Sequence, residues 1–182
     1  MKGNRVALAA VLAVVLIAAA WWLLRRGTAP PPVHLIPIFE SAEKRPAGGT
    51  FEVIEAELEG EKKQAIYTVP ASRIIYRVRI PDGAYLGVAV GMKPESWTQE
   101  GDGVLFRVGV SDGRTYDERF TQHVNPFANK GDRKWHQIWV DLSGYSGEEV
   151  ELIFNTNTSP PGKGEDPRND HALWGAPEIV VR

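Results

Sequence analysis

Cysteine is absent from the 182 residues of the sequence. Its absence excludes disulfide bonds, thiolate metal ligands and a cysteine nucleophile. It does not identify the compartment, because a disulfide-free domain can fold on either side of a membrane. The sequence also has no basic excess, since its formal net charge is −2. The usual electrostatic support for nucleic-acid binding is therefore missing, and we expect no nucleic-acid partner.

Several signatures of catalysis are missing as well. No phosphate-binding Walker loop, no G-x-G-x-x-G and no H-E-x-x-H occurs. A glycoside hydrolase needs two carboxylates across a cleft. The acidic cluster of residues 52–59 belongs to one expected strand, whose alternate side chains point to opposite faces. We therefore predict that the protein is not an enzyme.

One long apolar run stands near the N-terminus. Residues 6–24 contain no charged side chain, and a helix of this length spans about 28 Å, close to the hydrocarbon thickness of a bilayer. Trp21 and Trp22 lie near one end of the run, where indole rings favour the membrane interface. The sequence therefore predicts an anchor, residues 1–26, with one transmembrane α-helix that contacts membrane lipid through residues 6–24.

A cleaved signal peptide is the rival interpretation of this segment, with Lys2 and Arg5 as its basic start and residues 18–20 as its small-residue site. The apolar run continues past that site through residues 21–24, which favours an uncleaved anchor. Two basic residues flank the run on each side, and the amino terminus adds a positive charge before it. This excess favours a single-pass protein whose soluble domain is extracytoplasmic.

A linker is expected between the anchor and the domain, over residues 27–49. Its first part, 27–32, reads G-T-A-P-P-P, a polyproline II spacer that holds a domain away from the membrane. Residues 33–39 are apolar and could form a first edge strand or a segment packed on the domain. The domain itself is assigned to residues 50–182.

The domain is expected to be all-β, because strand patterns follow one another and no sustained helical period occurs after residue 24. Turn signals separate the strands, as at residues 81–83 (P-D-G) and 111–114 (S-D-G-R). Eight or nine short strands favour a two-sheet jelly-roll sandwich. The expected strands are 50–58, 64–69, 73–80, 84–91, 104–110, 115–121, 135–142, 149–155 and 178–181.

Two segments carry a resemblance to a known group of domains. Residues 132–147 read D-R-K-W-H-Q-I-W-V-D-L-S-G-Y-S-G, and residues 170–177 read D-H-A-L-W-G-A-P. They resemble galactose-binding-like β-jelly-roll modules, which are similar to carbohydrate-binding modules and occur beside bacterial sulfatases and glycosyltransferases. The resemblance covers about residues 51–181 and implies the jelly-roll fold. It leaves the ligand open, because this superfamily binds sugars, lipids, nucleic acids and proteins.

Sugar binding needs an exposed aromatic ring for the apolar face of a pyranose, with polar groups nearby for its hydroxyls. Trp139 is one such ring, because it faces outward beside Gln137 if its strand neighbours face the core. It could instead pack under residues 33–39 or on a partner. Trp97 could reach a ligand from a loop or cover one end of the core. Trp174, just before the expected final strand, is expected to seal one end of the sandwich. The predicted ligand-binding residues are Trp97, Tyr116, Trp139 and Gln137.

A long loop is expected at residues 155–173, and loops of this length are often binding loops. Asp166, Asn169 and Asp170 stand close together near its end. Carboxylate and amide oxygens at this density could hold a structural Ca²⁺ ion, which related jelly-roll modules often carry. The alternative is that these side chains only cap turns and contact solvent.

Two functions remain open. The first is a membrane-tethered, extracytoplasmic, non-catalytic binding module, with a glycan as its partner. The second is a structural or accessory subunit of a membrane complex, whose β domain packs on membrane-protein partners. The resemblance favours the binding module.

Overall fold

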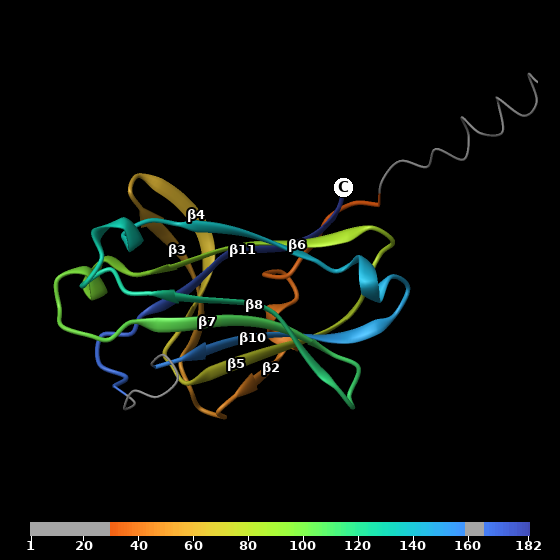
Figure 1. The fold of residues 1–182 in the computed structure, drawn as a ribbon, viewed down its shortest axis with the longest axis horizontal. Helices are drawn as coiled ribbons and strands as arrows, with labels where there is room; N and C mark the ends of the chain where they lie inside the picture. Colours follow the sequence, from red (N-terminus) through yellow and green to blue (C-terminus); the bar gives the residue numbers. More distant parts are fainter. Residues whose placement is uncertain (1–29, 159–165) are drawn as a thin grey trace, which may run out of the picture. The chain divides into compact units, whose positions relative to one another are not determined.

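The computed structural model describes residues 30–158 and 166–182. Over these residues the chain is all-β, and two antiparallel sheets pack face to face as a sandwich (Figure 1). Within this part of the chain the helices are four short 3-10 turns, and none is long and apolar enough to cross a bilayer. The expected anchor, residues 1–26, lies outside the described residues. The 3-10 turns are Phe39–Ser41 (η1), Pro94–Trp97 (η2), Lys130–Asp132 (η3) and Ser143–Tyr145 (η4).

The first sheet has six strands, in the order β3-β4-β11-β6-β9 with β1 paired to β11. Its centre is β11, which pairs with β4 on one side and with β6 on the other. The strands are β1 (Val33–His34), β3 (Phe51–Leu58), β4 (Glu61–Thr68), β6 (Ala84–Met92), β9 (His136–Asp141) and β11 (Ala172–Val181).

The second sheet has five strands, in the order β2-β5-β10-β7-β8. From β5 onward the chain changes sheet at every connection except the β7–β8 hairpin, so strands distant in sequence become neighbours. This pattern is consistent with the expected jelly roll. The strands are β2 (Glu43–Arg45), β5 (Ser72–Arg79), β7 (Val104–Ser111), β8 (Tyr116–Val124) and β10 (Glu149–Asn157).

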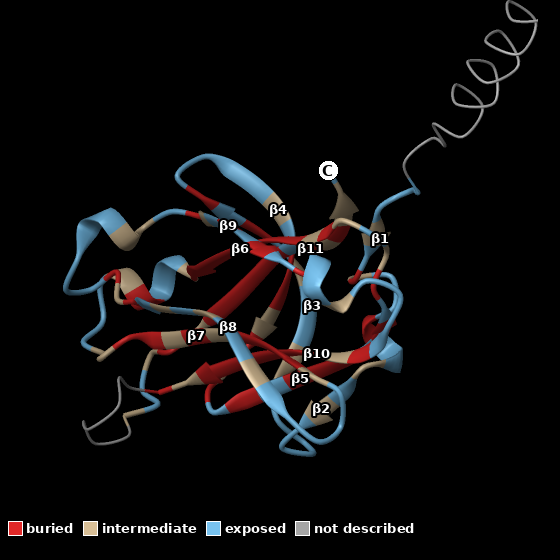
Figure 2. Cartoon of the chain, turned by 45° about the vertical axis from the view of Figure 1, so that its right-hand side comes forward, coloured by how far each residue is buried: buried red, intermediate tan, exposed pale blue. Residues whose placement is uncertain are grey.

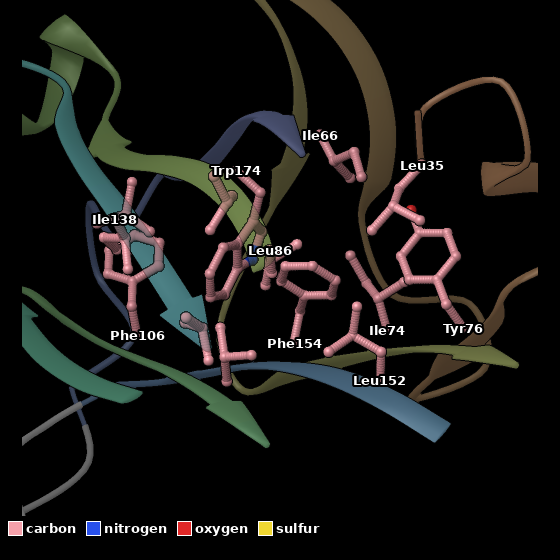
Figure 3. Packing of buried hydrophobic residues seen from close by; sticks show 14 of the residues in the cluster. Leu35, Ile66, Ile74, Tyr76, Leu86, Phe106, Ile138, Leu152, Phe154 and Trp174 are labelled. Atoms are coloured by element: carbon pink, nitrogen blue, oxygen red, sulfur yellow. The ribbon is translucent and has the colours of Figure 1, made fainter. Parts of the chain in front are cut away.

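The core forms between the sheets, where buried residues gather on the facing sides (Figure 2). Trp174 of β11 lies between two rings of the opposite sheet (Figure 3). Its centroid is 5.0 Å from that of Phe106 and 4.9 Å from that of Phe154, and both contacts are edge-to-face. Such contacts stabilise beyond the area they bury. The structural role expected for Trp174 is confirmed, although the residue lies within β11 and not before the final strand.

Several boundaries differ from the sequence-based expectation, and the two largest differences concern the start of the domain and the start of the final strand. The folded unit begins at Pro31, not at residue 50. Residues 33–39 both pair and pack, because β1 joins β11 while Leu35 and Phe39 are buried. The final strand begins at Ala172, not at residue 178. Its register shifts between Gly175 and Glu178, and this irregularity breaks the alternation by which a strand is recognised in sequence.

Replacing Trp174 by alanine tests the inter-sheet cluster. The side chain is 1% exposed, so its removal leaves a cavity between the sheets and should lower the free energy of unfolding by about 3–5 kcal/mol. Urea denaturation followed by fluorescence measures the change. Phe127→Ala is the control, because this ring is 43% exposed and its loss should cost less than about 0.5 kcal/mol. An equal decrease in the free energy of unfolding in both variants would contradict the role of Trp174 in the inter-sheet cluster.

Candidate functional site

A cleft of about 430 Å³ opens on the outer face of the five-stranded sheet. Ile75 of β5 and Ile153 of β10 pair directly and line it. They are only 4% and 5% exposed although they alternate with core-facing residues. They therefore form an apolar floor. The other residues that line the cleft are Arg45, Arg73, Arg107, Ser111, Tyr116, Glu151 and Asn155.

Tyr116 forms the aromatic wall of the cleft. It is the first residue of β8, pairs with Ser111 and remains 41% exposed. Its ring lies against the backbone of Gly109, where an added Cβ atom would stand 2.3 Å from the ring carbon Cε2. The amide of Asn155 donates a hydrogen bond of 3.4 Å to its hydroxyl. A glycine at 109 is therefore required for the ring to lie in this position.

Polar side chains line the cleft beside Tyr116. Arg73 donates from Nε to Oδ1 of Asn155 at 2.7 Å. Arg107 forms a hydrogen bond and an ion pair with Glu118 of the neighbouring strand. These contacts hold donors and acceptors beside the apolar floor, an arrangement suited to a ligand with both apolar and hydroxyl-bearing surfaces.

Trp139 and Gln137 lie on the outer face of the other sheet. Trp139 is 42% exposed, and its ring lies against Gly87, where an added Cβ would stand 2.5 Å from Cζ3. The guanidinium of Arg182 covers the ring at 3.3 Å from its centroid. Gln137 donates from Nε2 to the carbonyl of Val88 at 3.3 Å. The outward orientation expected for Trp139 is found, but Arg182 competes for its stacking surface.

Trp97 is the last residue of η2. Its indole donates to the carbonyl of Met92 at 3.0 Å, and its ring packs on a small apolar cluster that contains Trp135 and Leu173. This environment corresponds to the alternative in which Trp97 covers part of the core. The four predicted ligand-binding residues therefore lie in three separate places, and Tyr116 alone lines the cleft. Their role in binding stays a prediction.

Residues 109–113 read G-V-S-D-G, which is the G-x-S-x-G spacing of a serine-hydrolase nucleophile turn. That function requires a strand-to-helix turn and a histidine base. Here the segment ends β7 and enters the hairpin to β8, and Ser111 Oγ accepts a hydrogen bond of 3.0 Å from the Gly113 amide. No histidine is among the residues that line the cleft. The G-x-S-x-G spacing of residues 109–113 therefore belongs to a β-hairpin turn.

Arg73, Arg107 and Asn155 were not among the sequence-based candidates. Each lies at an outward position of a strand whose intervening residues face the core. The alternation of β5 in the sequence does place Arg73 outward. The alternation within one strand could not show that β10 and β7 would place Asn155 and Arg107 next to Arg73.

Asp170 is a buried carboxylate just before β11. It is 1% exposed, and neither of its oxygens has a hydrogen-bond partner among the described residues. Burial, together with the negative charges of Asp102 and Asp166, raises its pKa to about 8. A carboxylate in such a place is stable when it is protonated or when a cation compensates its charge.

The predicted calcium ligands fit this position only in part. Asp166 is bound by Arg168, whose Nη2 lies 2.6 Å from Oδ2, and this bond lowers the pKa of Asp166 to about 2. Asn169 donates its amide to the Glu100 carbonyl at 2.9 Å. In residues 30–158 and 166–182, no group of three acidic or histidine side chains could hold a metal. The calcium site stays a prediction that depends on Asp170.

Comparison with known protein families and sequences adds little about function. No family model matches the chain. A protein of Archaeoglobus fulgidus described as uncharacterized is 37% identical over 107 residues. The match covers 58% of this chain and 26% of that protein, so this chain spans about a quarter of the length of the relative.

Solved structures show that the fold is shared with carbohydrate-binding modules. The CBM51 of Clostridium perfringens GH95, in complex with methyl-galactose, has a TM-score of 0.57 at 19% identity, over 82% of this chain and 100% of that one. CBM51-2 with INT domains of Clostridium perfringens ZmpB, in complex with GlcNAc, has a TM-score of 0.51 at 17% identity, over 87% and 31%. At these identities the likeness establishes a common β-sandwich.

The raised pKa of Asp170 predicts how stability depends on pH when a chelator keeps the protein metal-free. The unfolded carboxyl loses its proton near its ordinary value of 3.8, whereas the native one keeps it to about 8. The free energy of unfolding should therefore fall as pH rises between these values and level off above the higher one. Urea denaturation across this range measures the slope.

Asp170→Asn should flatten this slope, whereas the exposed Asp82→Asn should leave it unchanged. The same slope in the protein and in Asp170→Asn would contradict the raised pKa. In a second arm, Ca²⁺ is added at neutral pH. Stabilisation of the protein but not of Asp170→Asn would confirm the calcium prediction, and no stabilisation of either would refute it.

Proposed function

We propose that the β-sandwich is a non-catalytic carbohydrate-binding module whose ligand occupies the cleft beside Tyr116. The observation that carries this proposal is an exposed aromatic ring in a cleft that is also lined by two isoleucines and by amide and guanidinium groups. A sugar ring presents apolar C–H groups on its faces and hydroxyls around its rim. The cleft offers a surface for each.

The shared fold supports this proposal. The sandwich resembles modules solved with methyl-galactose and with GlcNAc, so this architecture accommodates saccharides of different kinds. Because a fold hosts many functions, the ligand must be argued from the side chains of the site. A cavity of about 430 Å³ lies within the common range for small-ligand sites.

Tyr116→Ala tests the cleft directly. The full-length chain in detergent is screened on a glycan array, and the affinity for a bound glycan is then measured by calorimetry. Loss of a central aromatic contact costs about 2 kcal/mol, so the affinity should fall ~30-fold. Tyr116→Phe keeps the ring and should bind nearly as well as the unaltered protein.

Trp139→Ala is the matched control for this test, because Trp139 is equally exposed but lies on the other sheet. It should bind as the unaltered protein does. Loss of binding in Trp139→Ala alone would move the site to the six-stranded sheet. Absence of any glycan ligand would refute the proposed function.

We also propose that residues 6–24 tether this module to a membrane, with the β domain on the extracytoplasmic side. The apolar run and its flanking charges support this. The tagged full-length chain should stay in the membrane fraction after alkaline carbonate extraction, whereas a chain without residues 1–26 should become soluble. Protease added outside intact cells should cut the domain, and protection from the protease would reverse the orientation.

A further inference from the structure

A row of basic side chains crosses the five-stranded sheet at one edge of the cleft. Arg45 of β2 stands opposite Arg73 of β5, Arg73 opposite Asn155 of β10, and Asn155 opposite Arg107 of β7. All four line the cleft. Like charges directly opposite each other in a sheet are destabilising, so the Arg45–Arg73 pair has an electrostatic cost in the free protein.

The outer members of the row have carboxylate partners. Arg45 reaches Glu43 at 2.5 Å, and Arg107 is paired with Glu118. The remaining carboxylate of the cleft is that of Glu151. Its Oε1 lies 3.4 Å from Nη2 of Arg77, the residue opposite it on β5. The acidic side chains around the cleft are therefore already engaged.

Arg73 is different from the other two arginines. Its contact in the described part of the chain is the neutral amide of Asn155, which accepts from Nε at 2.7 Å. This bond orients the guanidinium and leaves its terminal nitrogens for a ligand. Asn155 is 7% exposed and also bonds Tyr116, so one buried amide fixes both the cation and the aromatic wall.

The spacing of the rows suits a sugar with an acidic substituent. The basic row and the apolar floor are two residues apart along β5 and β10, a separation of about 7 Å on one face of a sheet. A sugar ring over Ile75 and Ile153 would thus place a ring substituent beside Arg73. The planar guanidinium fork matches a carboxylate or sulfate group better than a hydroxyl.

We propose that the cleft binds an anionic saccharide, with the carboxylate or sulfate group of the sugar held by Arg73. This inference rests on the proposed carbohydrate-binding function and names the chemical class of its ligand. The anion supplies the charged partner that Arg73 lacks among the described residues, and Asn155 holds Arg73 in place for it. Tyr116 and the isoleucine floor contact the ring.

A matched pair of probes tests the charge requirement. Oligogalacturonate and its methyl ester share one backbone and differ in the carboxylate charge, and dextran sulfate against dextran forms the second arm for sulfate. The full-length chain in detergent should bind the charged member of at least one pair about tenfold more tightly than the neutral member. The affinity for it should fall as salt concentration rises. The arm that responds identifies the acidic group.

Arg73→Gln removes the charge and keeps a side-chain amide near Asn155. It should lower affinity for the charged probe about tenfold and lower affinity for the neutral probe less, because the glutamine amide can still donate to a hydroxyl. Arg79→Gln is the matched control, because Arg79 is an exposed arginine on the same face of the same strand, outside the cleft. It should bind both probes as the unaltered protein does.

The outcomes separate this inference from the proposed function. Equal binding of charged and neutral probes, with Tyr116→Ala impaired and Arg73→Gln unimpaired, would overturn the anionic specificity and keep the carbohydrate site. Equal effects of Arg73→Gln and Arg79→Gln would reduce the effect to general surface charge and overturn it too. No binding of any saccharide would overturn both.

Discussion

The contact between Trp174 and the rings of Phe106 and Phe154 is the interaction on which the sandwich depends. Trp174 comes from the central strand of one sheet, and its two partners come from adjacent strands of the other. Large rings packed edge to face fill the space between sheets without leaving voids. The contact also sets which side of β7 and β10 faces outward, and therefore which side chains can reach a ligand.

The outer face of the five-stranded sheet carries like charges that lie directly opposite each other. A sheet face exposed to solvent usually carries charges that alternate in sign, yet Arg45 and Arg73 stand directly opposite each other. Tyr116 lies on the sheet surface against Gly109, where any side chain would displace the ring. Side chains that lower the stability of the free protein are expected at functional sites, where a bound ligand compensates for them.

Much of the fold could be predicted, because strand alternation is a local property. The strand at residues 73–80 and the hairpin turn at residues 111–114 were found close to where they were expected. The start of β11 was missed, since Gly175 and a register shift interrupt its alternation. Both of the first two strands lie in the expected linker, where an edge strand was considered for residues 33–39 but none was expected at Glu43–Arg45. Short edge strands carry too few residues to show a period.

The sequence by itself determined the all-β class, the strand alternation that turns Arg73 outward and the exposed position of Trp139. Only the tertiary structure decided that Arg73, Asn155 and Arg107 form one row beside Tyr116. These residues come from strands far apart in the sequence, and their register depends on the sheet order β2-β5-β10-β7-β8. That order is set by packing between the sheets, which local sequence patterns do not encode.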